Sequence, residues 1–85
     1  MSKKATTKDE LFLLKLYEMA SALGDPEGEI DKYAIGRAIG QNDKGVDTIS
    51  NLLAQTNFIK KTSDNRVYLT PHGLNLVRAL KDERG

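Results

Sequence analysis

The spacing of apolar residues changes after Asn57, and this change restricts the fold more than any other feature of the sequence. Before Asn57, apolar residues recur every three or four positions, as on one face of an α-helix. After it, residues 58–62 and 66–69 are short segments rich in β-branched and aromatic residues. The three polar residues between them, 63–65, are typical of a hairpin turn. The chain is therefore expected to be α+β and mostly helical, with one hairpin late in the sequence.

Residues 7–23 predict the first helix. Thr7 and Glu10 are spaced as a capping box, in which each side chain bonds the backbone N–H of the other residue. Gly24 and the turn sequence 25–28 end the helix. The apolar face is a stripe of about 60° at 100° per residue. It consists of Phe12, Leu16, Met19 and Leu23, flanked by Leu13 and Ala20.

Leu11 and Leu14 lie outside this stripe, next to the charged residues Lys15 and Glu18. One apolar stripe is enough to fill a core, so a second patch on the same helix needs another partner. Two interpretations remain open. The two leucines form a homodimer contact, or they contact the last helix of the same chain.

Two further helices are expected before the hairpin. Asp31 is suited to cap a helix over 32–39, and residues 29–30 can form a very short strand before it. The polar turn 41–43 leads into a helix over about 43–56. One side of that helix is apolar and consists of Val46, Ile49, Leu52, Leu53 and Thr56. The opposite side carries Lys44, Asp47, Thr48, Asn51 and Gln55.

Thr70 is suited to cap the last helix, which is expected over about 71–83. Pro71 would occupy its first position, where a missing N–H has no consequence. The apolar side of this helix consists of Leu74, Leu76, Val77 and Leu80. The small polar residues 1–6 are expected to be a disordered tail. Residues 7–84 would then form a single domain.

The order helix, helix, short polar turn, amphipathic helix, hairpin, helix resembles that of the winged helix-turn-helix DNA-binding domains. Three segments carry the resemblance. The recognition helix of the family is similar to Thr48-Ile49-Ser50-Asn51-Leu52-Leu53, and the entry into its first wing strand is similar to Phe58-Ile59. The second wing strand, with its Leu-Thr-Pro-x-Gly junction, is similar to Val67-Tyr68-Leu69-Thr70-Pro71-His72-Gly73. The resemblance covers about 29–80. It implies a three-helix core with the recognition helix over about 43–56, a two-stranded wing over about 58–69 and a C-terminal helix.

The resemblance also implies a small transcriptional regulator that binds double-stranded DNA, with the third helix in the major groove and the wing beside it. Asn51 and Gln55 carry amides with the donor and acceptor geometry for adenine. The Thr48 methyl can meet a thymine methyl, and Lys44 can reach a guanine edge or a phosphate. The candidate phosphate contacts on the wing are Lys60, Lys61 and Arg66. This hypothesis requires the polar side of the helix and the cationic hairpin to share one solvent-facing surface.

Other interpretations of these residues stay open. The amides can simply be solvated, and cations on a hairpin also discourage edge-to-edge aggregation. Asp43 and Asp47 lie on or beside the polar side of the helix, where they would repel phosphates. The alternative function is therefore a protein-interaction or dimerisation module that uses a winged-helix scaffold without binding DNA.

The near-neutral net charge of +1 conceals a polarised chain. Residues 5–31 hold two basic and seven acidic side chains, a balance of −5. Residues 32–78 hold seven basic and three acidic side chains, a balance of +4. The half with the helix pair and the hairpin is thus the positive one, which favours an anionic partner for that half.

The composition indicates no enzymatic activity. A chain of 85 residues has little room for a deep cleft, and His72 is the only histidine. With no cysteine and no metal-ligand spacing, neither a metal nor a cofactor is expected, and no small-molecule substrate is evident. The sequence contains no signal-peptide pattern and no apolar run long enough for a membrane span, so a cytoplasmic protein is expected, associated with the nucleoid if it binds DNA.

Overall fold

A computed structural model describes residues 7–84, which form four α-helices and a three-stranded antiparallel sheet. The helices are α1 (Lys8–Ala22), α2 (Lys32–Ala38), α3 (Asp43–Gln55) and α4 (Pro71–Arg84). The strands are β1 (Ile30–Asp31), β2 (Ile59–Lys61) and β3 (Arg66–Leu69), and a 3₁₀ turn, η1 (Ser63–Asn65), joins the last two. The expected α+β class and helix order are confirmed. The short strand begins one residue later than expected, and the predicted tail over 1–6 lies outside the described residues.

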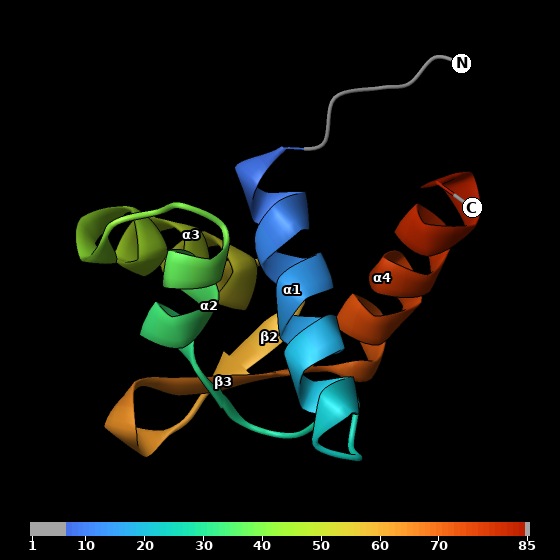
Figure 1. Cartoon of the computed structure of the whole chain (residues 1–85), viewed down its shortest axis with the longest axis horizontal. Coiled ribbons are helices and arrows are strands. Elements are labelled where there is room, and N and C mark those ends of the chain that lie inside the picture. The colour runs from blue at the N-terminus through green and yellow to red at the C-terminus, as the bar shows by residue number, and fades with distance from the viewer. Residues whose placement is uncertain (1–6, 85) are drawn as a thin grey trace.

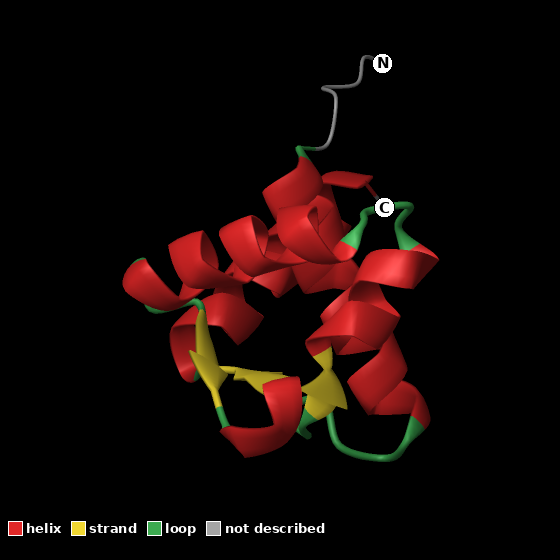
Figure 2. Ribbon diagram, turned by 90° about the vertical axis from the view of Figure 1, so that its left-hand side faces the viewer, coloured by secondary structure: helices red, strands yellow, loops and turns green. Residues whose placement is uncertain are grey.

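The sheet has the strand order β1–β3–β2, and the helices gather on one of its faces (Figures 1 and 2). Helix α1 lies between α2 on one side and α4 on the other (Figure 1). Because α1 has helices on two sides and the sheet below it, it supplies much of the core. The buried side chains of α1 are Phe12, Leu13, Leu16 and Ala20.

Two leucines that the apolar stripes assign to the core are exposed. Leu23 is 77% exposed, because it is the C-cap residue and projects past the last turn of α1. Leu52 is 45% exposed, because the residues that α3 buries are Val46, Ile49, Ser50 and Leu53. Ser50 thus takes the place in the core that the apolar stripe assigns to Leu52. The Ser50 hydroxyl tolerates full burial by donating a hydrogen bond to the Asp47 carbonyl at 3.2 Å.

The hairpin closes through two residues in the left-handed backbone region. Asp64 and Asn65 have φ angles of 64° and 63°, which short polar side chains tolerate better than others. The Arg66 N–H donates to the Ser63 carbonyl, and the Thr62 N–H donates to the Arg66 carbonyl. The turn predicted at 63–65 is confirmed. It forms there because Asp64 and Asn65 tolerate the positive φ angles that the turn requires.

The pairing register divides the sheet residues between two faces. The residues that face the helices are buried: Ile30, Ile59, Val67 and Leu69. Since successive strand residues point to opposite faces, Lys60 and its cross-strand partner Tyr68 point away from the helices, together with Arg66. We call this side the outer face of the sheet. Lys61 is paired with Val67 and therefore points to the helix side.

Thr70 and Gly73 hold the start of α4 against the segment between α3 and β2. The Thr70 hydroxyl donates to the Asn57 carbonyl at 2.6 Å and accepts from the Gly73 N–H at 3.0 Å. The Thr70 N–H donates to the Phe58 carbonyl at 3.1 Å. A Cβ atom at Gly73 would lie 1.9 Å from that same Phe58 carbonyl oxygen, so only glycine allows this approach. Asn57, with a φ angle of 69°, makes the sharp exit from α3.

We expect Gly73→Ala to destabilise the protein. In an ordinary helix interior, glycine to alanine stabilises by about 0.5–1 kcal/mol. Here the added methyl group meets backbone that cannot move aside, so a loss of about 1–3 kcal/mol is expected instead. Thermal unfolding followed by circular dichroism measures the change, with Asn75→Ala on the exposed side of α4 as the matched control. A Gly73→Ala variant that melts at or above the wild-type temperature would contradict the close approach.

Candidate nucleic-acid interface

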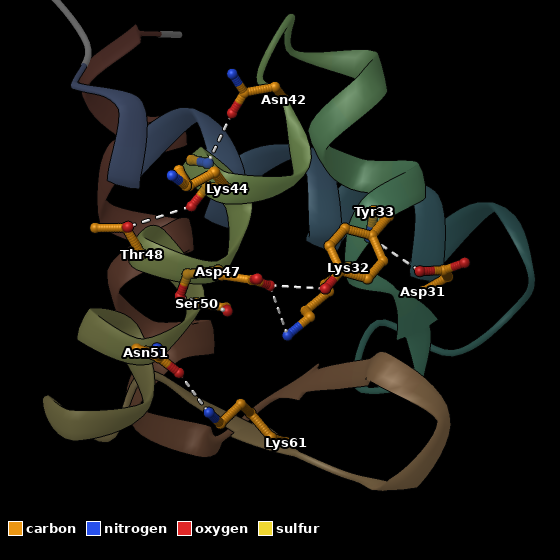
Figure 3. Close-up of polar contacts among 11 residues, drawn as sticks. Asp31, Lys32, Tyr33, Asn42, Lys44, Asp47, Thr48, Ser50, Asn51 and Lys61 are labelled. Atoms are coloured by element: carbon orange, nitrogen blue, oxygen red, sulfur yellow. Dashed lines mark hydrogen bonds and ion pairs between the residues drawn. The ribbon is translucent and has the colours of Figure 1, made fainter.

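The exposed side of α3 is a row of polar side chains. Asn42 begins the helix by accepting a hydrogen bond from the Gly45 N–H at 2.8 Å, which fixes the first turn. The exposed residues at helical spacing are then Lys44, Thr48, Asn51 and Gln55, which we call the α3 face. Figure 3 shows the first three of them following α3 toward the hairpin. The structure thus brings together the four helix residues that the sequence singles out.

The side chains of the α3 face differ in what they can offer a partner. The Thr48 hydroxyl donates to the Lys44 carbonyl at 3.2 Å, which engages its hydrogen within the helix. The methyl group of Thr48 is then the part available for apolar contact. The side chains of Lys44 and Gln55 are exposed, and neither has a hydrogen-bond partner among the side chains that the structure describes. The α3 face therefore combines a cation, a methyl group and two amides.

Lys61 joins the hairpin to the α3 face. Its ammonium group donates a hydrogen bond of 2.5 Å to Oδ1 of Asn51, across ten residues of sequence (Figure 3). The contact follows from the register, because Lys61 is the last residue of β2 and points to the side of the sheet on which the helices lie. Both side chains are exposed, so the pair lies on the surface of the protein. One cation of the hairpin therefore shares a surface with α3.

The other two hairpin cations lie on the outer face of the sheet. Lys60 stands opposite Tyr68 in the register, and Arg66 precedes Tyr68 by two residues on the same side. The Arg66 guanidinium lies 4.0 Å from a Glu29 carboxylate oxygen, a marginal ion pair between exposed groups. The expectation that all three hairpin cations share one surface with α3 therefore holds for Lys61 and is wrong for Lys60 and Arg66, because neighbouring strand residues point to opposite faces of the sheet.

Asp47 is held by α2 at the border of the α3 face. The Tyr33 hydroxyl donates to Oδ1 of Asp47 at 2.8 Å, and the Lys32 ammonium lies 3.1 Å from the same oxygen (Figure 3). The hydrogen bonds from Tyr33 and Lys32 hold the pKa of the Asp47 carboxyl below its usual value. The same contact with the carboxylate raises the pKa of the Tyr33 hydroxyl. The negative charge that seemed adverse to an anionic partner is therefore compensated by a cation, while Asp43 stays exposed.

Sequence patterns did not indicate that Lys32 and Tyr33 belong to this surface. They precede Asp47 by more than a dozen residues, and only the packing of α2 on α3 brings them close. That packing is tight, because a Cβ atom at Gly36 would lie 2.1 Å from a methyl carbon of Val46.

Leu52 is the other residue missed, an apolar side chain beside the α3 face. A helical wheel in which Leu53 marks the centre of the buried side would have placed Leu52 at the border of the α3 face.

Leu11 and Leu14 line a surface groove of about 330 Å³ on α1. The groove is also lined by Ile39 at the end of α2 and by Lys81 of α4, whose ammonium lies 5.5 Å from the centre of the Tyr17 ring. The remaining lining residues are Lys15, Tyr17, Glu18 and Ser21. Leu14 is half-buried and packs against the core, whereas Leu11 is 38% exposed. The groove shares no lining residue with α3 or with the hairpin.

Comparison of the chain with protein-family models, with curated proteins and with solved structures finds no match. None of the helices between residues 7 and 84 combines the length and the apolar character that crossing a membrane requires. The described residues thus form a small α+β domain with a polar, partly cationic surface on α3 and the hairpin.

The Asp47 contacts predict a specific pH dependence of stability. Because the pKa of the carboxyl is lower in the folded protein than in the unfolded chain, its ionised form stabilises the fold above the unfolded value of about 3.9. This contribution is lost as the pH falls through the folded pKa. Asp47→Asn is therefore expected to melt below the wild type at pH 7, with the difference closing as the pH falls below the unfolded value.

Melting temperatures across this pH range at low salt measure the effect. Asp43→Asn is the matched control, because it removes the same charge from the first turn of the same helix, where the carboxylate has no ion-pair partner among the described side chains. Its effect on the melting temperature at pH 7 is expected to be smaller than that of Asp47→Asn, because it breaks no contact with Tyr33 or Lys32. A gap for Asp47→Asn that is equally large at pH 7 and at pH 2 would show that the charge of Asp47 is not what stabilises the contact.

Proposed function

We propose that this protein is a winged-helix DNA-binding protein, acting as a small transcriptional regulator. In this proposal α3 enters the major groove, and the hairpin of β2 and β3 is the wing that lies against the phosphate backbone. The order of helices and strands and the placement of the hairpin beside α3 support the winged-helix assignment. The segment 67–73, which carries the resemblance to the second wing strand and its junction, lies where β3 passes into α4.

The observation that carries the proposal is the contact between Asn51 and Lys61, which makes the α3 face and the edge of the hairpin one surface. Helix α3 has 13 residues and is therefore about 20 Å long at 1.5 Å per residue, which suits one major-groove half-site. The α3 face offers amide groups and a methyl group, which are the chemical groups that read base edges. Compensation of Asp47 by Lys32 removes one of the two adverse charges.

The cations at the rim of this surface suit the phosphate backbone. Lys44 lies at the start of α3, and Lys60 and Arg66 lie on the outer face of the hairpin. A narrow hairpin laid across the backbone can present both of its faces to phosphates on either side. Contacts of this kind position a protein on DNA without reading its sequence.

We expect binding to DNA that weakens steeply with salt. Three to four phosphate contacts give a slope of log K against log salt of about −3 to −4. Lys60→Ala together with Arg66→Ala should reduce the magnitude of this slope by about 2 and weaken binding to all sequences alike. Fluorescence anisotropy of a labelled random-sequence duplex, titrated between about 50 and 200 mM salt, measures both values.

The matched control replaces Lys8 and Arg78 by alanine, which removes two exposed cations of α1 and α4 that line neither the α1 groove nor the α3 face. This variant should keep the wild-type slope. No retention of the wild type on the duplex at about 50 mM salt, or a slope near zero, would favour the alternative of a protein-interaction module.

The groove on α1 favours a second property, self-association. In this part of the proposal, Leu11 and Leu14 form a contact between two copies of the chain. Because the groove shares no residue with the α3 face, two copies joined there would keep both α3 faces available. Two such helices about 34 Å apart would meet successive major grooves on one side of the duplex.

Leu11→Glu combined with Leu14→Glu is expected to convert the dimer into a monomer, because two buried carboxylates would then meet two others across the contact. Light scattering coupled to size-exclusion chromatography gives the mass. Leu23→Glu is the control, since this exposed leucine of the α1 C-cap does not line the groove. A wild type that is monomeric at about 100 μM would refute the dimer and leave the DNA-binding proposal unchanged.

A further inference from the structure

The Asp47 carboxylate uses only one of its two oxygens to join α3 to α2. Oδ1 accepts from the Tyr33 hydroxyl at 2.8 Å and lies 3.1 Å from the Lys32 ammonium. An ionised carboxylate has about two lone pairs on each oxygen, so these two donors occupy Oδ1. Among the groups that the structure describes, none donates to Oδ2, and the Asp47 side chain is 48% exposed. The contact between the helices therefore leaves Oδ2 available to a partner.

Asp47 lies beside the α3 face, one helical turn before Asn51 (Figure 3). Residues four positions apart are neighbours on a helix surface, so the two side chains would meet adjacent parts of the same groove. The Lys32 ammonium compensates the charge of Asp47, which reduces its repulsion by phosphates. The carboxylate can therefore approach DNA in a way that an unpaired one on this helix, such as that of Asp43, cannot.

The available oxygen can only accept hydrogen bonds. The hydrogen bonds from Tyr33 and Lys32 hold the pKa of the Asp47 carboxyl below its usual value, so the group is ionised at neutral pH and has no proton to donate. In the major groove, guanine shows the acceptors N7 and O6, and thymine shows the acceptor O4. A carboxylate oxygen is repelled by these groups. Cytosine and adenine each show an amino group, which is the donor that it requires.

Of these two bases, cytosine is the better match. The amino group of adenine lies between its own N7 and the O4 of the paired thymine, so an approaching carboxylate meets an acceptor on both sides. The amino group of cytosine has such a neighbour on one side only, the O6 of the paired guanine. An oxygen that only accepts is therefore repelled least at cytosine.

We infer that Asp47 reads cytosine through Oδ2, and that Tyr33 and Lys32 are positioning residues that hold the carboxylate for this contact. The inference rests on the proposed function, because it requires α3 to lie in the major groove. It makes Asp47 a specificity-determining residue, although its charge alone would oppose DNA binding. It also gives the contact between α2 and α3 a role in recognition.

The experiment is a selection from a pool of random duplexes of about 20 base pairs at about 50 mM salt. The full chain is used as wild type, Asp47→Ala, Asp47→Asn, Tyr33→Phe and Asp43→Asn. The position read by Asp47 is the one whose base preference disappears in Asp47→Ala. We expect the wild type to select cytosine there, over guanine by about 10-fold.

Asp47→Asn is the variant that separates base reading from a structural role. Tyr33 and Lys32 both donate, so they would hold the oxygen of the new amide, and its N–H groups would take the place of Oδ2. A donor then replaces an acceptor at the same point. The preference should therefore change from cytosine to guanine or thymine, which show acceptors there.

The two remaining variants are the controls. Tyr33→Phe removes one donor from Oδ1 and keeps the charge of Asp47, so the cytosine preference should weaken while the affinity for a random duplex stays the same. Asp43→Asn removes an equal charge from the first turn of α3. It should strengthen binding to all duplexes alike and keep the cytosine preference.

The outcomes separate the inference from the proposal beneath it. A wild type that prefers any other base at the position read by Asp47 would overturn the inference. Asp47→Asn and Asp43→Asn that raise the affinity equally, with unchanged base preferences, would also overturn it, because Asp47 would then act only through its charge. A Tyr33→Phe variant with the full cytosine preference would overturn the positioning role.

Absence of salt-sensitive binding of the wild type to the pool would instead overturn the DNA-binding proposal itself. Because the Asp47 variants are expected to melt below the wild type, binding is compared at a temperature at which circular dichroism shows every variant to be folded.

Discussion

The geometry of the candidate interface depends on the junction at Thr70 and Gly73. The Thr70 hydroxyl bonds the Asn57 carbonyl and the Gly73 N–H at the same time, so one side chain connects the exit of α3 to the start of α4. The missing side chain at Gly73 lets the first turn of α4 contact the Phe58 carbonyl. Because Phe58 leads directly into β2, this junction sets the hairpin relative to α3. The reach of Lys61 to Asn51 follows from it.

A second close contact, between α2 and α3, sets the charge of the same surface. Gly36 packs against Val46, which brings Lys32 and Tyr33 next to Asp47. Without this packing the α3 face would carry an uncompensated carboxylate at its border. The close approach at Gly36 thus determines whether the charge of Asp47 is compensated. The charge that α3 presents therefore cannot be predicted from the residues of α3 alone.

The elements were predictable from local chemistry, and the contacts between them were not. Capping residues such as Thr7 and Asp31, and the polar turn at 63–65, determine structure within a few residues, and these predictions are confirmed. The sequence could also have predicted that Lys60 and Lys61 lie on different faces of the sheet, since neighbouring strand residues point to opposite faces. The partner of Lys61 lies ten residues away on another element, and only the packed structure supplies it.

The small net charge is a physical reason why the proposed DNA binding would require a dimer. With a net charge of +1, the protein cannot rely on bulk attraction to a polyanion, and one copy brings only a few cations to the α3 face and the hairpin. Each phosphate contact adds to both affinity and salt dependence, so a single copy would bind weakly at physiological salt. In the proposed dimer, two copies joined through the groove on α1 would double these contacts and make the second binding event intramolecular. In the proposed function, the sparse cationic surface and the groove on a separate part of the same domain would therefore serve the same binding event.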